Sequence, residues 1–422
     1  MTGAARIEGR DGMRPVTRRK VFYIPGFDPI HPRRYRELYR KESSVQAAIS
    51  GYEISQTPQP GGRAVGIPYG WTVAARIEGA DVTADISVLT WTDIVRDSMG
   101  TSIAATYGAL LRTAWVYIST GALFRLMRLR KGPVIAALYP VGFLLLQLGI
   151  ALGLGLLAAR LVAMGVEGIA PMIGPVVGAL MGVALCVAVL IWFRRRDGRY
   201  FAYYLMHDYS FSARHRGANP AALETRMRDF RALITEALDQ DWDEVLVIGH
   251  SSGAHLGISI LADLLRAGPL AKTGPALSFL SLGQVVPMVS FLPKADRLRG
   301  DLAFLSAQTD VFWLDVSAPG DGCAFALCDP AGVSGVAPEG QVAPLILSAA
   351  FTQTLSPARW KALRWRFFRL HFQYLCAFDR PGAYDYFRIT AGPQNLRDRF
   401  AGAAPSQSRI TRAVNRHTSV SS

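Results

Sequence analysis

The segment from residue 244 to residue 265 constrains the fold of this chain more than any other. Residues 245–248 are four consecutive apolar residues, which is typical of a buried parallel strand. They lead directly into the sequence Gly-His-Ser-Ser-Gly at 249–253, and residues 254–265 then carry apolar side chains at helical spacing. A strand that turns into a helix through Gly-x-Ser-x-Gly places the serine, here Ser251, at the end of a sheet.

In this setting the segment resembles the nucleophile elbow of the α/β-hydrolase superfamily of serine esterases and lipases. The resemblance implies a nucleophilic Ser251 and an oxyanion hole in which the amide of Ser252 is one donor. It also implies a second amide from the loop after an early strand. Residues 21–24 form such a strand, and Pro-Gly-Phe follows it, with proline where histidine is common in the family. We expect the amide of Phe27 to be the second donor, with a simple Pro-Gly turn as the alternative.

A serine hydroxyl needs a base to accept its proton and an acid to orient that base. In the family the order along the chain is serine, acid, histidine. The loop after an apolar strand at 311–316 carries Asp321, and catalytic groups gather at the carboxyl ends of parallel strands. We therefore expect Asp321 to be the acid. Asp315, within the strand, is the second choice, and a plain turn residue is the alternative role for Asp321.

The positions of the histidines in the chain narrow the choice of the base. Three follow Ser251 in the chain: His255, His371 and His417. His255 lies one turn along the predicted elbow helix, and His417 lies in the C-terminal tail. His371 remains as the expected base, although its aromatic neighbours would also suit a histidine of the core.

Two long apolar runs stand in the middle of the chain. Residues 133–159 and 168–193 carry no charge, and a membrane-spanning helix needs about 20 predominantly apolar residues. They predict a transmembrane hairpin joined at 160–167, with a pair of buried core helices as the alternative. Basic residues precede the first run and follow the second, so the positive-inside rule puts both outer ends in the cytoplasm.

Small residues predict how the two helices of the hairpin meet. Gly149-x-x-x-Gly153 and Gly174-x-x-x-Gly178 would let the helix backbones approach closely. A third apolar stretch at 102–124 contains a charged arginine, so we expect an interfacial or packed helix there and not a third span.

These features predict an α/β fold with a doubly wound, mostly parallel sheet and an inserted two-helix transmembrane hairpin. The expected strands and helices lie at 21–24, 32–49, 52–56, 71–77, 86–91, 221–238, 245–248, 277–282 and 311–316. The expected divisions are a basic segment at 1–20, the first part of the α/β domain at 21–101, an interfacial or packed helix at 102–132, the hairpin at 133–193, the main α/β domain at 194–400 and a disordered tail at 401–422.

The net charge of +14 invites a nucleic-acid partner, but the basic clusters border the apolar runs. Anionic lipid headgroups are therefore the expected counter-charge, and no nucleic acid is expected. No metal pattern is present, so we expect neither metal nor cofactor. The cysteines are expected to be free thiols, with a disulfide between Cys323 and Cys328 as the alternative.

The sequence thus predicts a membrane-anchored serine hydrolase with its catalytic domain in the cytoplasm. It would cleave an ester or thioester, of lipid origin if the site lies against the bilayer. The alternative is a catalytically inactive protein of the same fold that serves as a membrane scaffold or regulator.

Overall fold

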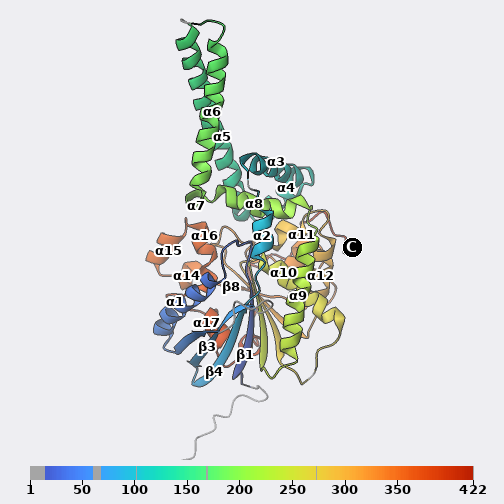
Figure 1. Ribbon diagram of the computed structural model, residues 1–422. Coiled ribbons are helices and arrows are strands. Elements are labelled where there is room, and N and C mark those ends of the chain that lie inside the picture. The colour runs from blue at the N-terminus through green and yellow to red at the C-terminus, as the bar shows by residue number, and fades with distance from the viewer. Residues whose placement is uncertain (1–14, 60–67, 101, 168–169, 272, 422) are drawn as a thin grey trace, which may run out of the picture.

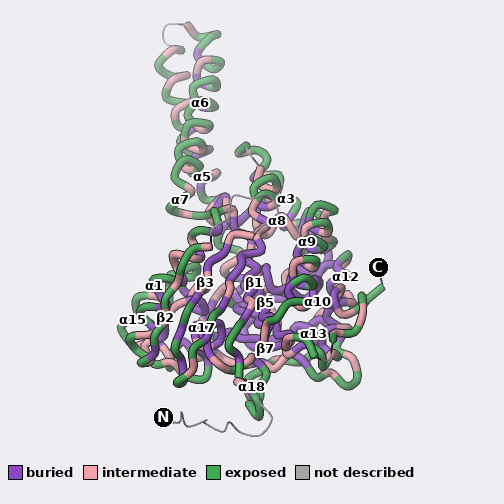
Figure 2. The backbone as a smooth tube through the Cα atoms, turned by 60° about the horizontal axis from the view of Figure 1, so that its bottom comes forward, coloured by how far each residue is buried: buried purple, intermediate pink, exposed green. Residues whose placement is uncertain are grey.

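A helix-flanked sheet forms the body of the protein, and a helical hairpin projects from it (Figure 1). The computed structural model describes residues 15–59, 68–100, 102–167, 170–271 and 273–421. Buried positions gather in the body, whereas the hairpin is largely exposed along its length (Figure 2). The first 14 residues of the expected basic segment lie outside the described residues.

The sheet has eight strands in the order β2-β3-β4-β1-β5-β6-β7-β8. The six strands from β4 to β8 along this order are parallel, and β2 and β3 are antiparallel at one edge. The strands are β1 (Arg18–Ile24), β2 (Glu53–Pro58), β3 (Tyr69–Ile77), β4 (Ala80–Val88), β5 (Glu244–His250), β6 (Ala276–Leu282), β7 (Val311–Ser317) and β8 (Leu345–Ser348). The prediction of an α/β fold with a mostly parallel sheet is confirmed.

Helices cover both faces of this sheet. Alternate side chains of β1 enter two separate cores: Val21 and Tyr23 pack on the side of α1, and Phe22 and Ile24 on the side of α9 and α10. The helices of the body are α1 (Arg33–Ser50), α2 (Thr92–Ser98), α9 (Ala221–Leu238), α10 (Gly253–Ala267), α11 (Val286–Ser290), α12 (Asp296–Ser306), α13 (Pro330–Ser334), α14 (Phe351–Thr354), α15 (Pro357–Leu363), α16 (Phe367–His371), α17 (Tyr386–Ala391) and α18 (Leu396–Arg399). The helix predicted at 221–238 has the bounds that the structure shows for α9.

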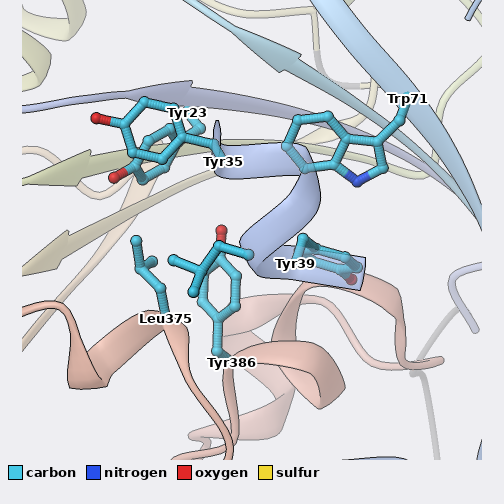
Figure 3. Close-up of a pocket in the computed structure, with 7 residues that line it drawn as sticks. Tyr23, Tyr35, Tyr39, Trp71, Leu375 and Tyr386 are labelled. Carbon is cyan, nitrogen blue, oxygen red and sulfur yellow. The ribbon is translucent and has the colours of Figure 1, made fainter. Parts of the chain in front are cut away.

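Aromatic side chains join α1 to the sheet and to the C-terminal part of the chain. The space that they leave between them is about 10 Å³, which is room for about one water molecule and not for a substrate. Figure 3 shows five of these aromatic side chains together with Leu375: Tyr23, Tyr35, Tyr39, Trp71 and Tyr386. Leu38 completes the lining of the space.

The hairpin consists of α5 (Lys131–Glu167) and α6 (Gly174–Arg195), which are long and apolar enough to cross a membrane. We expected residues 160–167 to connect the two helices of the hairpin, and this prediction is wrong. These residues continue α5, because nothing in them breaks a helix. With 37 residues, α5 is about 55 Å long at 1.5 Å per residue. Its first part packs against α8 (Ala202–Arg214), where Leu144 is fully buried. The part that extends freely is therefore close in length to α6.

Glycines bring the two helices of the hairpin into contact. A Cβ atom on Gly178 would lie 2.3 Å from the carbonyl oxygen of Ala159, and one on Gly182 would lie 2.6 Å from that of Gly155. The contact predicted through Gly174 and Gly178 is thus confirmed on α6. The one predicted through residues 149 and 153 is wrong, because a Cβ there would meet no atom within 4 Å. The sequence spacing alone does not tell which face of α5 meets α6.

Two helices occupy the stretch at 102–124 where one was expected. They are α3 (Ile103–Ser119) and α4 (Ala122–Leu129), and Gly121 between them has a φ of +71°. One face of α3 is buried against α8, and its outer face exposes Leu111, Trp115 and Ile118. The helix is therefore packed on the body on one side and open on the other.

The tail at 401–422, expected to be disordered, is ordered over its described residues. The amide of Ile410 donates to the carbonyl of Leu327 (2.7 Å), and the Arg299 guanidinium donates to the carbonyl of Ser419 (2.7 Å). The prediction was wrong because this segment is held by backbone hydrogen bonds to loops, which leave no hydrophobic period in the sequence. The expected start of the first strand also shifts, from 21 to Arg18, because Arg19 is buried in an ion pair with Glu244.

Candidate active site

The turn at Ser251 holds a serine in a conformation that side chains rarely adopt. Ser251 has a φ of +57°, and its amide donates to the carbonyl of Leu282 (2.9 Å). A non-glycine residue in this region is strained by about 1–3 kcal/mol, and such strain gathers at functional sites. Glycine at 253 is required, since a Cβ there would lie 2.1 Å from the carbonyl oxygen of Ile24. The start of α10 thus lies directly against the end of β1, as the Gly-x-Ser-x-Gly pattern predicts.

The structure brings His371 and Asp321 together. His371 Nδ1 lies 2.7 Å from Asp321 Oδ2, and both side chains are buried. The Asp321 carboxylate also accepts from the Tyr374 hydroxyl (3.0 Å) and from the amide of Cys323 (2.9 Å). Because a carboxylate only accepts, the proton of a neutral His371 lies on Nδ1 and its Nε2 carries the free lone pair. Nε2 is buried and has no hydrogen-bond partner in the described chain.

Ser251 and His371 line the same cavities. One has a volume of about 950 Å³, and a smaller one of about 70 Å³ adjoins the same two residues. Because Nε2 has no partner in the described chain, no hydrogen bond joins it to Ser251 Oγ. Catalytic hydrogen bonds are often long without substrate and tighten when it binds. An imidazole that is oriented by a carboxylate and has no other partner can activate a serine hydroxyl in the same cavity as a nucleophile.

The loop after β1 lies against Ser251. A Cβ on Gly26 would be 3.1 Å from Ser251 Cβ, so the backbone at 25–27 passes directly beside the serine. The carbonyl of Phe27 accepts a hydrogen bond from the Tyr204 hydroxyl, and its ring packs 5.9 Å from that of Trp91. Neither the amide of Phe27 nor that of Ser252 donates a hydrogen bond to another described residue. Both amides are thus free to bind an oxyanion beside Ser251.

The side chain of His250 contacts the backbone of His371, the candidate base. We did not predict this role from the sequence. The Nε2 of His250 lies 3.0 Å from the carbonyl oxygen of His371, and its Nδ1 lies 3.3 Å from the Tyr23 hydroxyl. The carbonyl can only accept, so Nε2 carries the proton and Nδ1 accepts from tyrosine. Burial, helped by the charge of His371, lowers the pKa of His250 to about 3. A neutral His250 therefore fixes the backbone of the residue that carries the base. In the sequence, the signal that could have indicated this role is the position of His250 directly before Ser251 in the Gly-x-Ser-x-Gly motif.

The second choice for the acid does not reach the base. Asp315 is buried within β7 and accepts a hydrogen bond from Ser281 Oγ (2.6 Å). Burial raises the pKa of Asp315 to about 7. His255 is buried in α10, where burial lowers its pKa to about 4. The geometry thus pairs His371 with Asp321 and leaves Asp315 and His255 in the core.

Three side chains of the site have the ligand types of a metal centre. The ligand atoms of Asp321, Cys323 and His371 lie within 4.8 Å of one another. Two of them already share the proton between Nδ1 and Oδ2. Burial and the charge of Asp321 raise the pKa of the Cys323 thiol well above its usual range, so a thiolate is disfavoured there. The group fits a hydrogen-bonded histidine better than a metal ion. All four cysteines are free, as predicted.

Comparison with known proteins gives no match: no protein family, no curated protein and no solved structure matches this chain. The features of the chain that point to a function are therefore those of its geometry. They are the strained turn at Ser251, the buried pair of His371 and Asp321, and the cavity that the serine and the histidine share.

Acid should destabilise the protein through His250. Its pKa is about 3 when folded and about 6.5 when unfolded, so below pH 6.5 the unfolded chain binds the proton first and stability is lost as pH falls. This group contributes a slope of up to about 1.4 kcal/mol per pH unit. We expect His250→Gln, which keeps a donor for the carbonyl of His371, to lose less stability than the wild type between pH 6.5 and 4. Denaturation in detergent at several pH values measures this, and equal slopes for both proteins would contradict it.

Proposed function

We propose that this protein is a membrane-anchored serine hydrolase of the α/β-hydrolase type that cleaves an acyl ester or thioester. The observation that carries the proposal is the buried His371–Asp321 pair, whose free Nε2 shares a cavity with the strained Ser251. The sheet order supports it, because β1 and β5 are neighbours and end at the same edge. The loop with the free amide and the turn with the serine therefore meet there.

In the proposed mechanism His371 Nε2 takes the proton of Ser251, and Oγ attacks the acyl carbonyl. The amides of Phe27 and Ser252 hold the oxyanion of the tetrahedral intermediate. As the intermediate collapses, His371 gives its proton to the departing alkoxide or thiolate, and an acyl-serine remains. His371 then deprotonates a water molecule that attacks this acyl group, and the returning proton restores Ser251. Asp321 orients the imidazole and stabilises its charged form throughout.

The hairpin of α5 and α6 would anchor this domain in a bilayer. Its lipid-facing surface carries large exposed side chains, and the one polar residue of the first run, Gln147, is buried. Basic residues before α5 and after α6 would lie at the cytoplasmic headgroups. We therefore infer that the body of the protein is cytoplasmic and that the turn after Glu167 lies outside.

The position of the cavity favours an amphipathic substrate. The chain leaves α6 through α7 (Asp197–Tyr200) and α8, and residues of both line the 950 Å³ cavity. Figure 1 shows these helices and α16 between the hairpin and the sheet. Trp365, Phe367 and Phe368 are exposed on and beside α16, and Phe368 also lines the cavity. Aromatic side chains at the level of the headgroups are typical of membrane contact. A lipid-derived ester could enter such a site from the bilayer.

A fluorophosphonate probe tests the nucleophile. The wild-type protein in detergent should be labelled on Ser251, and Ser251→Ala should lose all labelling and at least about 10³-fold of its ester hydrolysis. Ser44→Ala, at an exposed position of α1 away from the cavity, is the matched control and should still be labelled. Adding a chelator should leave the labelling as it is. An unlabelled wild-type protein that is well folded would contradict the proposal.

Thiol accessibility in intact cells tests the membrane topology. Met172 is 92% exposed beside the turn of the hairpin, and the side chain of Asp241 is 94% exposed on the body. A membrane-impermeant maleimide should label Met172→Cys in intact cells, and Asp241→Cys only after lysis. Labelling of Met172→Cys only after lysis would place the turn in the cytoplasm and remove the proposed topology.

A further inference from the structure

Asp208 is a carboxylate in the proposed catalytic cavity to which the mechanism gives no role. It lies on α8 and lines both the 950 Å³ cavity and the 70 Å³ cavity, as Ser251 and His371 do. No hydrogen bond or ion pair joins it to another described residue. The Asp208 residue is half-buried, so water in the cavity can reach it. A carboxylate that no protein group engages can accept a hydrogen bond from a ligand in the same cavity.

Several of the donors that line the cavities with Asp208 are occupied elsewhere. The Tyr204 hydroxyl donates to the carbonyl of Phe27, and the Tyr117 hydroxyl donates to the carbonyl of Met288 (2.8 Å). The cavity also contains Arg34 and Arg359, but these pair with Asp28 (3.1 Å) and Asp379 (3.3 Å). Lys41, Arg366 and Arg369 also line the larger cavity and Tyr209 lines the smaller one, and no hydrogen bond or ion pair joins any of them to Asp208.

The electrostatics agree with this placement. Burial raises the pKa of Asp208 to about 7, and the charge of His371 opposes the rise. A donor supplied by a ligand in the cavity would give this carboxylate a charge-assisted hydrogen bond.

The position on α8 also suggests why the carboxylate is there. Tyr204 and Asp208 are four residues apart, so they lie on the same face of the helix. Tyr204 fixes the loop that carries the proposed oxyanion amide, and Asp208 faces the cavity one turn later. One helix face thus contacts the oxyanion loop and presents a carboxylate beside Ser251.

We propose that Asp208 is a substrate-binding residue that accepts a hydrogen bond from a hydroxyl or ammonium group near the scissile acyl bond. The proposal rests on the proposed hydrolase function and specifies its substrate class. The substrate is an acyl ester whose alcohol part keeps a free hydroxyl or amine close to the ester, as a partial ester of a polyol or of an amino alcohol does. Sites built to bind such a group discriminate strongly against analogues that lack it.

Three octanoyl esters of similar size test this with the full-length protein in detergent. Their alcohol parts are ethane-1,2-diol, 2-(dimethylamino)ethanol and 2-methoxyethanol. The first keeps a free hydroxyl, the second carries an amine that is protonated at neutral pH, and the third has no hydrogen-bond donor. We expect kcat/KM of the wild type to favour a donor ester over the methoxy ester by about 10-fold or more. Preference for the hydroxyl ester would identify a polyol ester, and preference for the ammonium ester would identify an amino-alcohol ester.

Asp208→Ala should bring this ratio close to one, mainly by raising KM for the donor ester. Asp208→Asn keeps an acceptor oxygen, so it should retain a preference for the hydroxyl ester and lose one for the ammonium ester. Asp229→Ala, which removes an exposed carboxylate on α9 that lines neither cavity, is the matched control and should keep the wild-type ratio.

Two results would overturn the role of Asp208. One is a wild type that is labelled by the fluorophosphonate probe but treats the three esters alike. The other is an Asp208→Ala variant that loses the same factor on all three, as expected if the residue only supports the fold or His371. Failure of the probe to label the wild type would instead remove the hydrolase function itself.

Discussion

The close contact between the start of α10 and the end of β1 determines the geometry of the whole site. Glycine at 253 brings the helix backbone onto the carbonyl of Ile24, and glycine at 26 lets the next loop pass beside Ser251. A Cβ at 253 would overlap that carbonyl oxygen, and a Cβ at 26 would crowd Ser251 at 3.1 Å. At this contact Ser251 has a φ of +57°, and the loop at 25–27 passes directly beside it. The strained conformation persists because β1 and β5 are buried and each is paired with a strand on both sides.

A second layer of interactions positions the base. Asp321 and Tyr374 hold the ring of His371 from one side, and His250 holds its backbone from the other. His250 immediately precedes the proposed nucleophile in the chain, so the turn and the base are connected through one side chain. The His371 side chain is thus held at both its ring and its backbone, and the cavity that it lines has room for a ligand.

The sequence predicted the parts of this arrangement that depend on local order along the chain. Strand, turn and helix around Ser251 follow from apolar patterning, and the choice of Asp321 and His371 followed from the family order and from the loop after β7. The structure brings these two side chains together. The sheet core was predictable for the same reason, because the central strands are continuous apolar runs.

Other parts depend on contacts between distant segments, which leave no period in the sequence. Strand β8 has only four residues, Leu345–Ser348, and was not predicted. The tail was expected to be disordered because its order comes from backbone hydrogen bonds to remote loops. The contact face of α5 was assigned to the wrong glycines, since both faces of an apolar helix look alike. Asp208 gave no signal because a lone aspartate gains meaning only from the cavity that it lines.

The most direct test of the account is a comparison of Asp321→Asn with Asp315→Asn. Both changes replace a buried carboxyl group with an amide, and the two residues are only six positions apart. If Asp321 orients His371, Asp321→Asn should lower kcat for ester hydrolysis by about 10³–10⁴-fold, while Asp315→Asn keeps most of it. Full activity in Asp321→Asn, or an equal loss in Asp315→Asn, would contradict the proposed triad.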